Sequence, residues 1–162
     1  MDLQQIRRSA IAPALALLPA KMSGARAEVQ MLAVGLQESR FEHRRQIGGP
    51  AVGFWQFEQG GGVRGVLTHP SSREHAAAIC RTRGIPASAS AVYSALVTDD
   101  VLAAAFARLL LWTDPAALPA VGAVASAWDL YLRTWRPGKP HPDTWKGLYM
   151  QAMAAVIGEV PA

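Results

Sequence analysis

Residues 26–58 decide the fold of this chain, because they hold the motifs GLQESRF at residues 35–41 and GFWQFE at residues 53–58. Ahead of the first motif, apolar residues recur at the spacing i, i+3, i+4 and i+7. They are Val29, Leu32, Ala33 and Leu36. This spacing predicts a helix with one buried face, followed by a polar turn and an aromatic segment.

The ends of this predicted helix place an acid in its last turn. Ser23 is a candidate cap at the start. Gly48-Gly49-Pro50 cannot continue a helix, so we expect the helix to stop between Ser39 and His43. Glu38 then lies where the helix dipole and burial against aromatic residues both raise the pKa of a carboxyl group. That suits a general acid, although on this pattern alone Glu38 is equally an ordinary surface glutamate.

The two motifs resemble a signature of the soluble lytic transglycosylases and of the wider lysozyme-like superfamily. The matching residues are ESRF at 38–41 and GFWQ at 53–56. The likeness to members encoded by bacteriophages and prophages extends to VLTHP at 66–70 and WRPGKP at 135–140. This resemblance implies a mainly α, single-domain lysozyme-like fold over residues 1–162, with a small loop or hairpin region after the catalytic helix.

The resemblance also implies an activity and its residues. In that superfamily one glutamate is the sole catalytic acid and base, and it corresponds to Glu38. The implied substrate is peptidoglycan, cleaved at the β-1,4 bond between MurNAc and GlcNAc, and we expect no cofactor and no metal. The expected substrate-binding residues are Ser39, Phe54, Trp55, Gln56, Glu58, Trp128 and Tyr131.

The third motif of the family, Ala-Tyr-Asn followed by glycine, is only approached here by AWDLY at residues 127–131. The family tyrosine places a hydroxyl near the catalytic acid, which Trp128 cannot do. Tyr131, about one helical turn further on, is a candidate to replace it. This departure leaves transglycosylase and hydrolase both open.

A hydrolase usually adds a second carboxylate that stabilises the oxocarbenium-like centre. Glu42, Glu58 and Asp129 are the candidates, and for Glu58 we favour a salt bridge to an arginine over a catalytic role. Trp55, Trp128 and Trp135 are candidates for stacking on sugars, although aromatic residues of helical proteins are usually core.

Composition and charge predict one helical domain with a basic surface. The 162 residues are 51% hydrophobic, which is enough to bury a core. The net charge of +4 and the pI near 9.7 suit an anionic polymer, either a cell wall or a nucleic acid. The arginines are spread and no recognition helix stands out, so we do not expect nucleic acid as the partner.

The N-terminal residues combine features of a secretion signal and of a first helix. An arginine pair at residues 7–8 precedes a short apolar run. Pro13 and Pro19 interrupt this run, which is too short to span a membrane. We favour a first helix at residues 11–22, distorted at Pro19, over a cleaved signal.

Helix signals also predict the remaining elements. The predicted helices cover residues 63–67, 73–83 with Gly84 as the stop, 86–97, 99–112 with Thr98 as the cap, 121–134, and a last helix capped by Asp143. The glycines at 60–62 predict a turn beside the cleft, and Cys80 is expected to be buried rather than reactive.

The resemblance implies a protein made in the cytoplasm of a bacterial host. It would act at the cell wall or be carried in a phage particle, as a monomer without a transmembrane segment. Two alternatives stay open. One is a muramidase with Glu58 or Asp129 as its second carboxylate, and the other is a glycan-binding or virion structural domain without activity.

Overall fold

The molecule is built from helices, and the computed structural model describes residues 1–158. In chain order the helices are α1 (Leu3–Ile6), α2 (Ala12–Ala16), α3 (Ala25–Ser39), α4 (Arg64–Thr68), α5 (Arg73–Arg83), α6 (Ala89–Ala95), α7 (Asp100–Trp112), α8 (Val124–Trp135) and α9 (Pro142–Ile157). Turns of π-helix at Arg7–Ile11 and Gln59–Val63, and a 3-10 turn at Ala20–Met22, complete the helical structure of the described residues. The prediction of a mainly α fold is confirmed.

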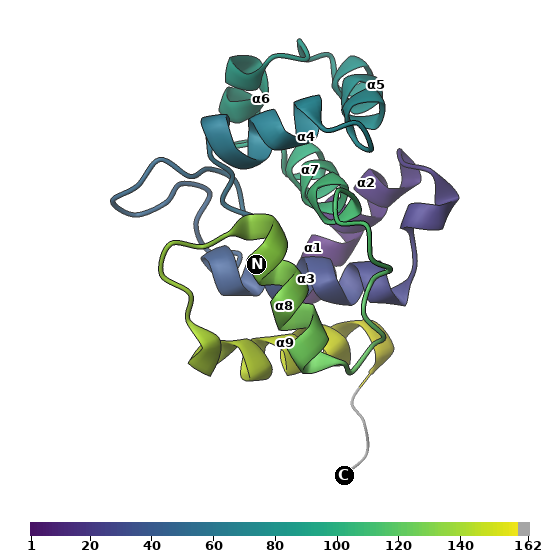
Figure 1. Cartoon of the computed structure of the whole chain (residues 1–162), viewed down its shortest axis with the longest axis vertical. Helices are drawn as coiled ribbons and strands as arrows, with labels where there is room; N and C mark the ends of the chain where they lie inside the picture. Colours follow the sequence, from purple (N-terminus) through teal and green to yellow (C-terminus); the bar gives the residue numbers. More distant parts are fainter. Residues whose placement is uncertain (159–162) are drawn as a thin grey trace.

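α7 is the central element of the fold. Figure 1 shows it between α4, α5 and α6 at one end of the molecule and α3, α8 and α9 at the other. Every residue from Leu102 to Leu111 is buried, as expected for a helix that packs against neighbours on all sides. The buried apolar side chains of both ends belong to one hydrophobic core.

The N-terminal helical segment begins earlier than predicted. Asp2 and Gln5 form a capping box, so the helix starts at Leu3 rather than at residue 11. The segment ends at Ala16, and Pro19 comes just before the separate 3-10 turn, so the predicted helix end at residue 22 is wrong. Ile6, Ala10, Ile11 and Ala14 are fully buried, which makes this segment part of the core.

Helix caps were the least accurate part of the sequence prediction. Ser23 is not the cap of α3, because Gly24 occupies the N-cap position and no side chain caps the helix. α7 is capped by Asp99, whose carboxylate accepts a hydrogen bond from the amide of Leu102, and not by Thr98. Asp143 lies in the first turn of α9 rather than before it. α5, by contrast, has the predicted bounds.

The segment between α3 and the second motif contains little regular structure. Within the described residues, its β structure consists of two isolated antiparallel bridges, Arg45 to Val52 and Val52 to Phe57. This agrees with the loop or small hairpin expected after α3. Figure 1 shows the segment looping out at one side of the molecule.

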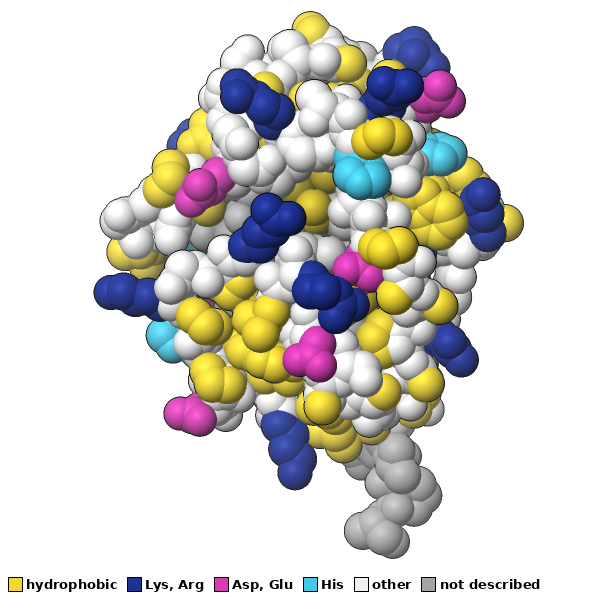
Figure 2. All heavy atoms as spheres, viewed as in Figure 1, with side chains coloured by type: hydrophobic (Ala, Val, Ile, Leu, Met, Phe, Trp, Pro, Cys, Tyr) yellow, Lys and Arg dark blue, Asp and Glu magenta, His cyan; other side chains and the backbone are white. Residues whose placement is uncertain are grey.

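Charged side chains are scattered rather than clustered on one face of the molecule. On the face drawn in Figure 2, Lys and Arg side chains are scattered and lie among Asp and Glu side chains. Ion pairs join Arg7 to Glu28 and Arg133 to Asp114. Within residues 1–158, no helix combines the length and the apolar character that crossing a membrane requires.

Candidate active site

Glu38 lies in the last turn of α3 with its carboxyl group half-buried. The hydroxyl of Tyr131, on α8, donates a hydrogen bond of 2.5 Å to Oε1 of Glu38. Burial raises the pKa of Glu38 from 4.5 to about 7, and the hydrogen bond from Tyr131 opposes part of that rise. A carboxyl group in this state exchanges a proton readily at neutral pH.

Tyr131 acts as the donor in this pair. Burial, together with the charge of Glu38 and the hydrogen bond to it, raises the pKa of the Tyr131 hydroxyl above its ordinary value. The hydroxyl therefore keeps its proton when the carboxyl group loses its own. The structure thus places the hydroxyl of Tyr131 beside Glu38, and Tyr131 is the residue that the sequence suggested for this position.

The end of α3 is fixed by a sharp change of backbone direction. Arg40 and Phe41 both adopt positive φ angles, 56° and 55°, which stop the helix directly after Ser39. The hydroxyl of Ser39 donates a hydrogen bond of 2.6 Å to the carbonyl of Phe54 and accepts one of 3.1 Å from the amide of Phe41. Ser39 therefore joins the two motifs.

Ser39 does not line the site, contrary to prediction. Its side chain is 5% exposed and its hydroxyl is engaged with backbone groups of the protein. The serine of this motif thus holds Glu38 in place by fixing the helix end, and it has no surface to offer a substrate.

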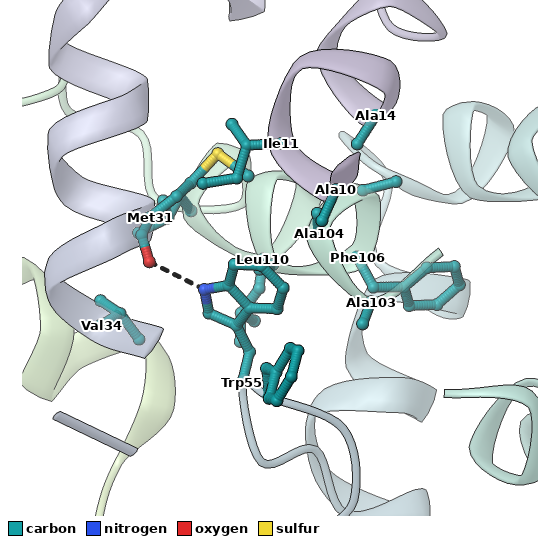
Figure 3. Packing of buried hydrophobic residues seen from close by; sticks show 14 of the residues in the cluster. Ala10, Ile11, Ala14, Met31, Val34, Trp55, Ala103, Ala104, Phe106 and Leu110 are labelled. Atoms are coloured by element: carbon teal, nitrogen blue, oxygen red, sulfur yellow. Dashed lines mark hydrogen bonds between the residues drawn. The ribbon is translucent and has the colours of Figure 1, made fainter. Parts of the chain in front are cut away.

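Trp55 and Phe54 are also core residues rather than sugar-binding ones. Their side chains are 0% and 1% exposed. Figure 3 shows Trp55 among buried apolar side chains, with its indole nitrogen donating a hydrogen bond of 2.8 Å to the carbonyl of Met31 on α3. The predicted substrate-binding role of both residues, and the stacking of Trp55 on a sugar, are wrong, because burying a large aromatic side chain stabilises the fold more than exposing it would.

A cleft of about 630 Å³ opens beside Glu38. Its walls come from the end of α3, from the second motif and the turn after it, and from the end of α8 with the loop that follows. The polar and aromatic residues lining it are Gln37, Glu38, Gln46, Gln56, Phe57, Glu58, Tyr131, Thr134, Trp135, Arg136, Lys139 and His141. The structure therefore brings Glu38 together with Gln56, Glu58 and Tyr131 from the predicted set.

Trp128 is not among the lining residues, so its predicted role is not supported. It packs against Tyr131 and Trp145, with ring centroids 5.3 and 5.4 Å apart. Trp135 lines the cleft instead, with its indole nitrogen bound to the carbonyl of Trp55 at 2.8 Å. Trp128 therefore contributes to the packing around Tyr131 rather than to the cleft wall.

Only one candidate for a second carboxylate shares the cleft with Glu38. Glu58 lines it and is exposed, and within residues 1–158 it forms no salt bridge. Glu42 and Asp129 are exposed and lie outside the cleft lining. Asp129 is therefore a poor second carboxylate, because a group outside the cleft cannot reach a bound sugar.

Two lining residues have unusual backbone conformations. Gln56 and Arg136 have φ angles of 52° and 49°, which residues other than glycine rarely adopt. The side-chain amide of Gln56 donates a hydrogen bond of 2.8 Å to the carbonyl of Gly53. Such conformations occur where the surrounding structure fixes a residue, and they are frequent at functional sites.

Sequence reasoning missed the basic lip of the cleft, Arg136 and Lys139. Both are exposed and line the cleft. Residues 136–142 contain three prolines and two basic side chains, but nothing in the sequence indicates that this loop faces Glu38. In the described residues, no group of three or more His, Cys, Asp or Glu side chains is arranged to hold a metal ion.

Comparison with known proteins adds no assignment to this geometry. The chain matches no protein-family model, and it has no match among curated proteins or solved structures.

Proposed function

We propose that this protein cleaves the glycan strands of peptidoglycan at the β-1,4 bond between MurNAc and GlcNAc, with Glu38 as the single general acid and base. One observation carries the proposal: the Glu38 carboxyl, with a pKa of about 7, lies in an open cleft and is hydrogen-bonded to Tyr131. A group whose pKa is near the working pH can donate a proton in one step and accept one in the next.

In the proposed reaction, protonated Glu38 donates its proton to the glycosidic oxygen as the bond from that oxygen to C1 breaks. The acetamido group of the substrate stabilises the positive charge that develops on the sugar. The Glu38 carboxylate then takes the proton of the muramyl 6-hydroxyl as that oxygen bonds to C1, which gives an anhydro product. The hydrogen bond from Tyr131 stabilises the carboxylate between the two steps.

The rest of the lining supports a polysaccharide substrate. Gln37, Gln46 and Gln56 line the cleft, and each amide keeps donors or acceptors, beyond its bonds within the protein, that can bond to sugar hydroxyls and acetamido groups. Arg136 and Lys139 on the lip offer cations to the carboxylates of the stem peptides. We propose accordingly that the protein, made in a bacterial host, acts on the cell wall or travels in a phage particle.

The test is turnover of purified sacculi by the wild type, by Glu38→Gln and by Glu42→Gln. Glu38→Gln should lower the release of soluble fragments by roughly 10²–10⁴-fold, since the amide can neither donate nor accept the proton. Glu42→Gln removes an equal charge four residues away and outside the cleft, and it should leave turnover unchanged. A wild type without turnover would favour the glycan-binding or virion structural alternative.

A hydrolase is the second candidate, because Glu58 lines the same cleft. Mass spectrometry of the digest separates the two reactions, since anhydromuramyl ends mean transglycosylase and reducing ends mean hydrolase. Under the leading proposal Glu58→Gln retains turnover with anhydro products. Loss of turnover in Glu58→Gln, with reducing ends in the wild type, would establish the hydrolase instead.

A further inference from the structure

A second cavity, of about 1010 Å³, lies at the other end of α3. It is bounded by the start of α3, the second half of α7 and the loop after α7. Ala25 and Glu38 are thirteen residues apart on one helix, which at 1.5 Å per residue separates the two sites by about 20 Å. This cavity is therefore not a subsite of the cleft.

Arg108, on α7, is a buried cation in the wall of this cavity. Its side chain is 3% exposed and its Nε donates a hydrogen bond of 2.7 Å to the carbonyl of Met22. Its Nη1 is buried and has no hydrogen-bond partner, and no carboxylate within residues 1–158 forms a salt bridge with it. Burial lowers the pKa of Arg108 to about 10, so the guanidinium stays charged at neutral pH.

The start of α3 supplies further groups that favour an anion. Gly24 at the N-cap leaves the helix without a side-chain cap, and the amides of Ala25, Arg26 and Ala27 donate no hydrogen bond within the described residues. Free amides at a helix start form a site for negative charge. Arg108 binds the carbonyl of Met22, only two residues before this N-cap, so cation and amides lie close together.

The remaining charges of the cavity wall are mostly positive. Lys21 and Arg26 line it, and the Lys21 ammonium lies 5.3 Å from the ring centroid of Trp112. The one carboxylate in the wall, among the described residues, belongs to Asp114, which accepts two hydrogen bonds from Arg133. Since Asp114 is already paired, the cavity keeps an excess of positive charge.

Apolar side chains make up another part of the wall. They include Leu111, Trp112, Leu118 and Val121. A bare inorganic ion would leave this apolar surface without contacts, whereas an anion attached to an apolar body would bury it. Cavity size, charge and lining therefore point to the same class of ligand.

We propose that this cavity binds an organic anion, with its carboxylate head at Arg108 and the start of α3 and its apolar body against the loop after α7. The head would accept hydrogen bonds from the guanidinium and from the free amides of Ala25 and Arg26. Binding of this kind is independent of glycan cleavage, because it uses the opposite end of α3.

The wild-type protein provides the first test, with octanoate and octanol as a matched pair of probes. In calorimetric titrations octanoate should bind about tenfold or more tightly than octanol, because only octanoate carries the charge that Arg108 pairs with. Amide NMR signals of residues 25–27 should shift with octanoate. Equal affinities for the two probes, or shifts confined to other residues, would overturn the proposal.

Arg108→Met and Arg64→Met provide the second test. Arg108→Met keeps most of the apolar length of the side chain but removes the charge, so it should lose about tenfold or more of the octanoate affinity. Arg64 is exposed on α4 and lines neither the cleft nor the second cavity, so Arg64→Met should bind octanoate like the wild type.

Unchanged octanoate affinity in Arg108→Met would overturn the assignment of the anion to this residue. A destabilised Arg108→Met that still binds octanoate would give Arg108 a structural role only. If this variant fails to fold, the comparison of octanoate with octanol in the wild type decides the question alone.

Discussion

At the scale of single residues, the contact between Glu38 and Tyr131 sets the chemistry available to the cleft. Burial favours the protonated carboxyl group, and the phenolic hydroxyl favours the carboxylate. The balance holds the pKa of Glu38 near 7, between the values that either effect would give alone. Both groups come from helix positions held by packing, Glu38 at the end of α3 and Tyr131 inside α8.

The pH dependence of turnover should report this pKa. With Glu38 as the acid, kcat/KM should fall about tenfold for each pH unit above about 7. Tyr131→Phe removes the hydrogen bond that lowers the pKa of Glu38, so the fall should begin at higher pH. Tyr93→Phe is the control, because the Tyr93 hydroxyl binds the carbonyl of Pro50 outside the cleft lining. Identical pH profiles for wild type and Tyr131→Phe would contradict the role of this bond.

Glu38 should also make stability depend on pH. Folding raises its pKa from the ordinary value of 4.5 to about 7, so the native protein holds the proton more tightly than the unfolded chain. The free energy of unfolding should therefore decrease as pH rises from about 4.5 to about 7. Glu38→Gln carries no such charge and should be more stable than wild type at pH 8 by about 3 kcal/mol. Urea titrations at pH 4 and pH 8 measure this, and an equal difference at both would show that the charge is not responsible.

At the scale of elements, the end of α3 is shaped by close packing of an aromatic ring on a glycine. A Cβ atom at Gly35 would lie 2.1 Å from Cζ of Phe41, so only glycine allows the ring to lie on the helix there. The ring also packs edge-on against Phe54 and Trp55, with centroids 5.5 and 5.4 Å away. The first motif thus folds back on its own helix and meets the second motif through Phe41.

Gly35→Ala should therefore destabilise the protein by about 1–3 kcal/mol and lower its melting temperature, because Phe41 has to leave its position. Gly147 is the matched control, since it lies inside α9 with no atom within 4 Å of an added Cβ. Gly147→Ala should stabilise the protein by roughly 0.5–1 kcal/mol through helix propensity. A Gly35→Ala variant as stable as Gly147→Ala would contradict the packing argument.

At the scale of the whole molecule, the net charge is +4, and cationic side chains are scattered on the face drawn in Figure 2, while two cations, Arg136 and Lys139, line the cleft. Under the proposed function, overall charge would assist approach to an anionic wall, and local charge would assist binding in the cleft. The contribution of overall charge should not depend on which cation is removed, whereas the contribution of local charge should be lost only when Arg136 or Lys139 is removed.

Sedimentation with purified sacculi should separate the two contributions, using Glu38→Gln as the background so that the wall is not digested. The bound fraction should fall as sodium chloride rises, because salt screens exposed charges. Adding Arg136→Gln and Lys139→Gln should lower binding more than adding Arg64→Gln and Arg73→Gln, which removes the same charge outside the cleft lining. Equal losses would mean that net charge alone governs binding.

The sequence by itself determined the helical class of this protein, the course of α3 and the position of its acid. Apolar spacing and residues that stop helices act over a few neighbours, so they predicted α5 with its bounds and the end of α3 near Ser39. Tyr131 was a candidate because one helical turn separates it from Trp128, and this too is a local relation.

Only the tertiary structure decided which residues of the motifs face the cleft and which are buried. Trp55 and Ser39 belong to the same short motifs as Gln56 and Glu38, yet the first pair is buried and the second pair faces the cleft. Arg136 lines the same cleft as Glu38, and Arg108 donates a hydrogen bond to the carbonyl of Met22, just before α3. Both relations bring together residues that are far apart in the chain. Burial depends on which residues from elsewhere in the chain pack against a side chain, and the spacing of neighbouring residues does not determine those contacts.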